Sequence, residues 1–152
     1  MERDGLPASN TSSRLENFGV ISGAADAVLG GAGNETVINH GRIVGDVDLG
    51  AGDDTFVFGG GGSLAGDLFL GAGDDHVVVE NGSGQSGVAD FSAGNASGDV
   101  IDLSEFFSSF SDVMAHSRQR GSDVVITLDN NDTLVLEKVH LDALNAGDFL
   151  LV

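Results

Sequence analysis

The sequence predicts an all-β fold: a right-handed parallel β-helix solenoid with a small C-terminal α+β cap made of a helix and a β-hairpin. Residues 49–58 return almost unchanged as residues 70–79, and a degraded copy occupies residues 30–38. The copies begin 19 and then 21 residues apart, which is the period of a repeat. Apolar residues alternate with polar ones behind each copy, as expected for strands with one buried face.

Each copy starts with a glycine-rich acidic turn and continues into an alternating apolar segment. Phe56 and Phe58 of one copy align with Val77 and Val79 of the next. Equivalent residues of stacked coils lie about 4.8 Å apart, the strand spacing within a sheet. We therefore expect apolar ladders between two parallel sheets, with the acidic turns along one edge and the uncharged run at residues 59–62 along the other.

Three segments follow from the positions of the repeats. Residues 1–16 are expected to be a loose leader or linker, residues 17–103 the repeats, and residues 104–152 the cap. Ser104 is placed to begin a helix that runs to about His116. The remaining expected elements are a hairpin of residues 122–128 and 133–139, a helical turn near residues 141–145, and a last strand at residues 149–152.

The charge of the chain restricts its partners. The net charge is −18, which argues against nucleic acid and anionic membrane. Residues 17–103 contain 13 acidic residues and one basic residue, Arg42. The absence of cysteine excludes disulfides and thiolate metal sites. Such a segment is expected to become compact only when a ligand neutralises its acids.

The stacked turns have the chemistry of a cation site. Asp53 and Asp74 would lie one coil apart, as would Asp54 and Asp75, and like charges at that distance repel. A hard dication between the turns would relieve this repulsion at neutral pH. Calcium is the expected ion because it accepts about six to eight oxygen ligands in irregular geometry. Glycine allows the turn carbonyls to point at the ion.

The motif resembles a known family. Gly-Gly-x-Gly-x-Asp-x-apolar-x is typical of the calcium-binding repeats of repeats-in-toxin (RTX) proteins. Two copies have leucine at the first glycine and keep the rest, with Asp54 and Asp75 at the motif aspartate, while the first copy has Glu35 there. The resemblance covers roughly residues 20–152. It implies a parallel β-roll that holds Ca²⁺ between successive turns.

In this sequence the strong copies recur every 19 to 21 residues, whereas RTX motifs typically recur every nine, so calcium is expected on one edge only. Three turns enclose two gaps, and a third ion is expected near Asn95 and Asp99. The predicted metal-site residues are Gly31, Gly33, Asn34, Glu35, Gly50, Gly52, Asp53, Asp54, Gly71, Gly73, Asp74, Asp75, Asn95 and Asp99.

The C-terminal residues extend the resemblance. Residues 90–104 and 121–128 look like the segments that follow the repeats in type I secreted proteins, and residues 148–152 are similar to their uncleaved secretion signal. This implies a secreted or cell-surface bacterial protein, exported unfolded by the type I secretion machinery and folded by external calcium. The expected role is a non-catalytic module. Its first coil has no evident N-terminal cap, so truncation, an upstream passenger domain or self-association is expected there.

Two other functions fit parts of the sequence. One is a structural or adhesive surface solenoid with glycan contacts; the other is a polysaccharide-modifying β-helix, which would need more basic residues than Arg42 alone. Residues 82–87 match the dinucleotide fingerprint Gly-x-Gly-x-x-Gly, but no helix is expected to follow them, so they are interpreted as a flexible loop. Hydrolase and zinc-protease motifs do not occur in the sequence.

Overall fold

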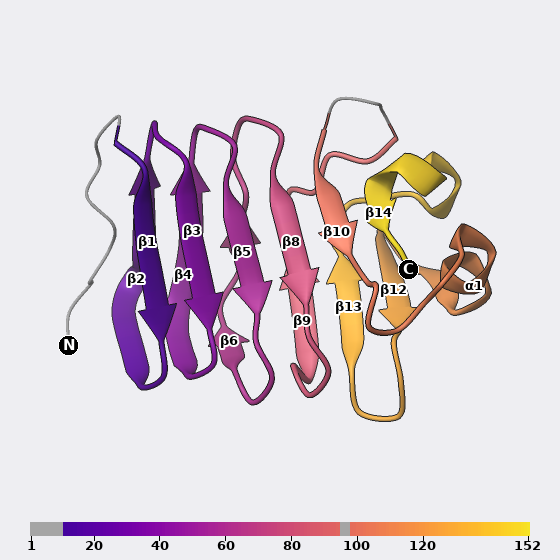
Figure 1. Ribbon diagram of the computed structural model, residues 1–152, viewed down its shortest axis with the longest axis horizontal. Helices are drawn as coiled ribbons and strands as arrows, with labels where there is room; N and C mark the ends of the chain where they lie inside the picture. Colours follow the sequence, from indigo (N-terminus) through magenta and orange to yellow (C-terminus); the bar gives the residue numbers. More distant parts are fainter. Residues whose placement is uncertain (1–10, 95–97) are drawn as a thin grey trace.

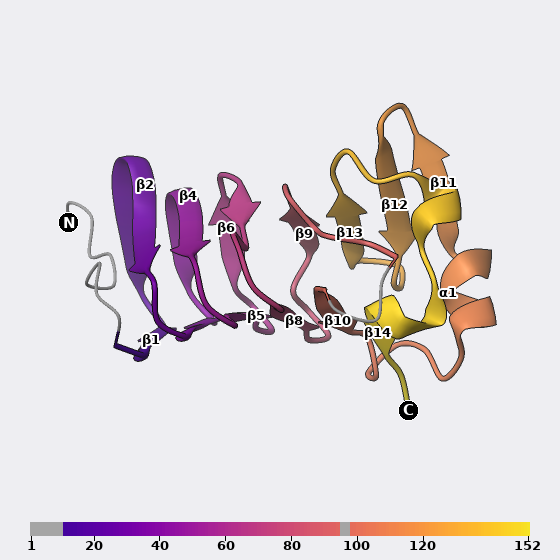
Figure 2. The same ribbon diagram turned by 90° about the horizontal axis from the view of Figure 1, so that it is seen from above.

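The computed structural model describes residues 11–94 and 98–152, and it confirms a mostly β fold in which parallel strands form a β-solenoid. Figure 1 shows the strands of successive coils side by side along the long axis of the molecule. Figure 2 shows the two layers into which each coil folds. The apolar core lies between these layers.

The first layer is one six-stranded sheet. Its order is β1-β3-β5-β8-β10-β14, and all its pairings are parallel. The strands are β1 (Ser13–Asn17), β3 (Glu35–Asn39), β5 (Thr55–Phe58), β8 (His76–Val79), β10 (Val100–Asp102) and β14 (Phe149–Leu150).

The second layer consists of two sheets. Strands β2, β4 and β6 pair in parallel, with β7 also on β4, and a separate sheet has the order β11-β12-β13-β9. The strands are β2 (Val20–Gly31), β4 (Arg42–Gly50), β6 (Ser63–Ala65), β7 (Leu68–Phe69), β9 (Gln85–Val88), β11 (Ser117–Arg120), β12 (Asp123–Thr127) and β13 (Thr133–Leu136).

The register agrees with the repeat alignment. Ile21 pairs with Ile43 and Ile43 with Leu64, as the periods of 22 and 21 predict. Phe56 pairs with Val77, and both are fully buried. Because strand side chains alternate between faces, every second residue of β5 and β8 enters the core while its neighbours face outward.

Asparagines rather than acids line the opposite edge of the first coils. Asn17 Nδ2 donates to Asn39 Oδ1 at 2.9 Å, and Asn39 Nδ2 donates to the carbonyl of Ser63 at 3.0 Å. Both amides are buried. Their side chains therefore connect one coil to the next without charge repulsion.

The expected leader is partly strand. Residues 13–16 belong to β1, where Leu15 pairs with Val37 and packs against the core. The segment was not recognised because it contains a single large apolar residue. Residues 1–10 of the expected leader lie outside the described residues.

The expected helix from Ser104 to His116 is shorter. Helix α1 comprises Phe110–Ala115, and its N-cap is Ser109, whose Oγ accepts from the N–H of Asp112 at 3.1 Å. Ser104 instead lies in a turn, where the N–H groups of Phe106 and Phe107 both donate to Leu103. The extended backbone of Ser109, with φ −149°, separates this turn from the helix.

The C-terminal segment joins the end of the solenoid (Figure 1). Strands β12 and β13 pair antiparallel, as expected for the hairpin, and β11 adds a strand that was not expected. Two 3₁₀ turns, Leu141–Ala143 and Ala146–Asp148, precede β14. Among the described residues, no helix has the length and apolar character needed to cross a membrane.

The flexible loop expected at residues 82–87 is wrong for its second half. Gln85 begins β9, which pairs in parallel with β13. The partner strand lies almost 50 residues further along the chain. Local sequence therefore carried no sign of the pairing.

Candidate metal-binding edge

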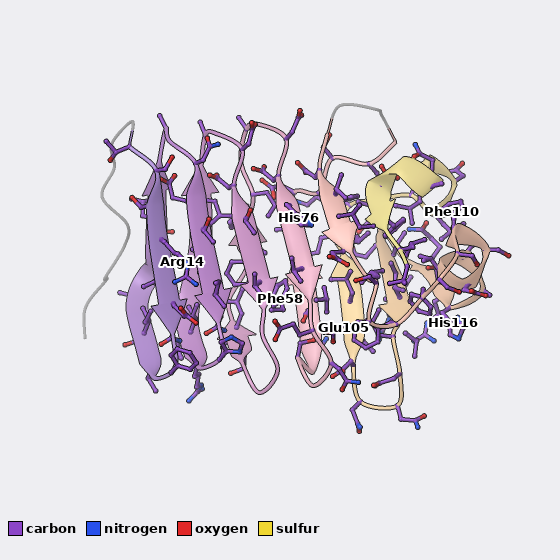
Figure 3. The ribbon with its side chains drawn as sticks, in the orientation of Figure 1. Arg14, Phe58, His76, Glu105, Phe110 and His116 are labelled. Carbon is purple, nitrogen blue, oxygen red and sulfur yellow. The ribbon has the colours of Figure 1, made fainter. Side chains whose placement is uncertain are left out.

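The acidic turns stack along one edge of the solenoid, as predicted. Gly31 pairs with Gly50, and Ala51 forms a bridge with Ala72. These turns precede β3, β5 and β8 and lie along the upper edge in Figure 1. In Figure 3 this edge is marked by His76, the first residue of β8.

Glycines allow the turns to approach this closely. Gly52 and Gly73 have φ of 129° and 146°, a region that residues with a side chain rarely adopt. A Cβ on Gly52 would lie 2.1 Å from the carbonyl oxygen of Gly33, and one on Gly73 would lie 1.9 Å from that of Gly52. The glycines of the motif are therefore required by contact between coils as well as by the turn.

Four carboxylates form what we call the inner row: Glu35, Asp54, Asp75 and Asp99. All four are buried. Each of the last three accepts the backbone N–H of its predecessor in the row, at 2.7 Å for Asp54, 2.8 Å for Asp75 and 3.2 Å for Asp99. The row is thus a continuous ladder of carboxylate–amide hydrogen bonds from coil to coil.

An exposed outer row runs beside it, made of Asn34, Asp53 and Asp74. The N–H of Asp53 donates to Asn34 Oδ1 at 3.1 Å, and the N–H of Asp74 donates to Asp53 Oδ1 at 3.0 Å. Both predicted acid positions of each turn therefore recur one above the other. The two rows differ in solvent exposure, since the inner row is dry and the outer row is wet.

Three carboxylates of the inner row are incompletely hydrogen-bonded. Glu35 Oε1, Asp54 Oδ2 and Asp75 Oδ2 are buried and find no hydrogen-bond partner within residues 11–94 and 98–152. A buried polar atom without a partner costs about 1–3 kcal/mol, and more when it is charged. These three oxygens are the ones that a cation between the turns would satisfy.

Other buried carboxylates lack this feature. Asp132 accepts the N–H groups of Gly82 and Gly84, both at 2.7 Å. Asp148 accepts those of Gly94 at 2.8 Å and Asn145 at 2.7 Å. Each of their oxygens is matched with a backbone donor. The unpartnered oxygens are therefore a property of the acidic turns and not of buried acids in general.

Burial shifts the titration of the inner row. Loss of solvent, reinforced by neighbouring carboxylates, raises the pKa of Asp54 to about 6 and that of Asp75 to about 7. Burial also raises the pKa of Asp99, where Asp90 is a nearby charge. Backbone N–H donors oppose all three shifts without cancelling them. In the absence of metal, the fold favours the protonated form of these acids.

We expect the metal-free protein to lose stability as pH rises. The folded pKa values of Asp54 and Asp75 exceed the unfolded value of about 3.9, so the folded state binds more protons between these limits. The stabilisation is complete below about pH 4 and disappears as pH rises through about 6 and 7. Thermal melts in EDTA from pH 5 to 8 should show a falling Tm.

The double variant Asp54→Asn/Asp75→Asn is the matched control for this pH dependence. Removing both titrating groups should flatten the profile. A Tm that rises with pH in EDTA for the unaltered chain would contradict the assignment.

The remaining predicted residues differ in what the structure says of them. Asp99 is in the inner row, but its two oxygens already accept N–H groups from Asp75 and Ser92. Asn95 lies outside the described residues. Across the part of the chain that is described, no three His, Cys, Asp or Glu side chains converge on one point. Backbone carbonyls of the turns would therefore have to complete any ion site.

Asp90 was not predicted as a site residue. Its two oxygens accept the N–H groups of Leu70 at 2.7 Å and Gly71 at 3.0 Å, at the start of the third acidic turn. The signal in the sequence was its place one coil after that turn, immediately before Phe91. Asp90 anchors the turn backbone and adds negative charge beside Asp75 and Asp99.

Comparisons with known proteins add little to this description. No protein-family model and no curated protein matches the chain. A search of solved structures finds the solution structure of the AlgE6R3 subunit from the mannuronan C5-epimerase of Azotobacter vinelandii. It is 20% identical, and the match covers 97% of this chain and 83% of that chain with a TM-score of 0.48. A similarity this distant supports no conclusion about function.

Proposed function

We propose that the chain is a non-catalytic calcium-binding β-roll that becomes ordered when Ca²⁺ enters the gaps between its acidic turns. The observation that carries the proposal is the row of buried, unpartnered oxygens on Glu35, Asp54 and Asp75. The two gaps between these three residues are the proposed binding positions. The same three carboxylates repel one another and are desolvated when no cation is present.

Calcium fits this donor set better than other common ions. The available ligands are carboxylate oxygens and the carbonyls of glycine turns, which are hard donors. Zinc favours imidazole and thiolate ligands; the chain has no cysteine, and its described histidines do not gather with acids into a metal-binding group. Magnesium requires near-ideal octahedral geometry and retains water, whereas the gap is lined by backbone and dry carboxylates.

Calcium binding would reverse the electrostatics of the inner row. Ion and carboxylate attract, so the bound ion favours the ionised form that burial alone disfavours. Each ion would be shared by two coils, and binding would therefore connect neighbours that otherwise repel. The net charge of −18 adds a long-range attraction for cations.

The proposed role in the cell is export and folding of a secreted protein. We propose that the chain passes unfolded through a type I channel, guided by its C-terminal residues, and folds in extracellular calcium. The C-terminal segment would act as the cap of the roll. Its support for that role is physical: Asp132 and Asp148 attach it to glycine loops about 50 residues away, and β14 extends the first sheet.

Replacing Asp75 with Asn tests the proposal by effects of opposite sign. Without calcium, Asp75→Asn removes a desolvated charge and should leave stability unchanged or raise it. With calcium, it removes a ligand and should weaken binding by about tenfold or more, measured by isothermal titration calorimetry.

The matched control is Asp67→Asn, which removes the same charge from an exposed position outside both rows. It should change stability by less than about 0.5 kcal/mol and leave calcium affinity nearly unaltered. Equal calcium affinity in Asp75→Asn and the unaltered chain would refute the proposed site.

A further inference from the structure

The second layer of the solenoid is interrupted between β6 and β9. These strands occupy consecutive coils (Figure 2), yet within the described chain they form no ladder. The coils are joined on either side of the interruption. The N–H of Gly61 donates to Gly82 at 2.9 Å, and the N–H of Ala89 donates to Leu68 at 2.8 Å. The strands therefore separate only over their middle.

Unpaired backbone faces this opening from both sides. The N–H of Ser63 donates toward the preceding coil, to Gly41, so the N–H and C=O of Leu64 point the other way, toward β9. On β9, the carbonyls of Gly84 and Val88 accept from the neighbouring strand β13. The intervening Gly87 consequently turns its backbone groups toward β6.

The opening is a cleft of about 310 Å³. Its lining includes Leu64, Gln85, Ser86, Gly87, Val135 and Glu137. Ser86 is 2% exposed, and its Oγ has no hydrogen-bond partner in the described structure. A buried hydroxyl without a partner indicates a missing ligand or water.

Gly87 keeps the cleft open without a conformational reason. Its φ is not positive, and a Cβ there would meet Val135 O at 3.6 Å, an ordinary contact. The glycines of the acidic turns, by contrast, cannot carry a Cβ. Strand residues with a side chain would pack better at position 87, so its absence has a consequence for the cleft rather than for the backbone.

We propose that this cleft binds one or two rings of a neutral saccharide. Hydroxyl groups both donate and accept, so they can match the N–H and C=O groups of Leu64 and Gly87 together with Ser86 Oγ. An ammonium group could only donate. A peptide strand is too wide, because it would need its flanking strands about twice 4.8 Å apart, and Cα atoms of β6 and β9 approach within 8 Å.

The charge around the cleft selects against acidic sugars. Glu137 lies on the lining, and the carboxylates of Asp67 and Asp123 are close enough to raise its pKa, after the larger effect of burial. An anionic uronate would be repelled by all three acids. The lower end of the usual range of ligand-pocket volumes, about 300 Å³, suits a ligand of this size.

The test is a titration of the full, calcium-loaded ¹⁵N-labelled chain with glucose, galactose, mannose and N-acetylglucosamine, and with glucuronate as the anionic control. At least one neutral sugar should give saturable amide shifts at Leu64, Gln85 and Gly87, with a dissociation constant of about 1 mM. Glucuronate should give none. No saturable shift with any neutral sugar means that water fills the cleft and overturns the proposal.

Two variants assign the binding to the cleft. Gly87→Val should abolish binding while the Tm is maintained, because valine suits a strand and fills the opening. The control Gly19→Val adds the same group at a distant glycine where a Cβ meets nothing closer than 4.0 Å, and it should bind normally. Ser86→Ala should weaken binding several-fold. Unchanged affinity in Gly87→Val would also overturn the proposal.

Discussion

Gly71→Ala is expected to destroy the ordered solenoid or to lower its free energy of unfolding by about 4 kcal/mol or more. A Cβ at Gly71 would lie 1.8 Å from the carbonyl oxygen of Gly50 in the preceding turn. The obstacle is backbone, which cannot move without separating two coils. The φ of Gly71, 96°, adds conformational strain.

Gly61→Ala separates the two contributions. Gly61 also has positive φ, 84°, but among the described atoms nothing lies within 4 Å of its Cβ position. It should cost only about 1–2 kcal/mol, the penalty for a left-handed residue with a side chain. Urea unfolding of both variants, each in EDTA and in calcium, measures the difference. Similar losses in the two variants would mean that the turns are not in close contact.

Removing calcium is expected to lower the Tm by about 10–20 °C. At a free concentration of about 100 times the dissociation constant, each site adds about 2.7 kcal/mol, so two sites add about 5 kcal/mol. One kcal/mol corresponds to about 2–4 °C for a chain of this size. Part of the effect comes from Asp54 and Asp75, whose ionised forms are disfavoured in the metal-free fold.

Circular dichroism melts in calcium, in EDTA and in magnesium at equal ionic strength provide this measurement. Magnesium is the control for general screening of the net charge of −18. It should recover only a small part of the calcium effect. A Tm in EDTA equal to that in calcium would contradict a structural role for the ion.

The repeat made the stacking of coils predictable from the sequence. The pairing of Ile21 with Ile43 and of Phe56 with Val77 follows from alternation and a period of about 20 residues, because a shift of one residue would expose the whole apolar face. The later insertion was also accommodated: Val100 pairs with His76, 24 residues earlier.

Features that depend on distant partners were not predictable. Strand β9 exists because β13 pairs with it, and β1 is recognised only through its pairing with β3. The acids are the clearest case. Asp75 and Asp148 are equally buried, yet Asp148 has both oxygens matched by N–H donors, and Asp75 does not. Nothing in the local sequence distinguishes an acid that binds backbone from one that is available to a metal.

The most direct measurement is a crystal structure determined from calcium-containing solution with anomalous scattering to identify the ion. Calcium binding at the inner row predicts one ion about 2.3–2.6 Å from Asp54 Oδ2 or Asp75 Oδ2, between the second and third acidic turns. A second ion is predicted between Glu35 and Asp54. Density showing only water at these oxygens, at saturating calcium, would contradict it.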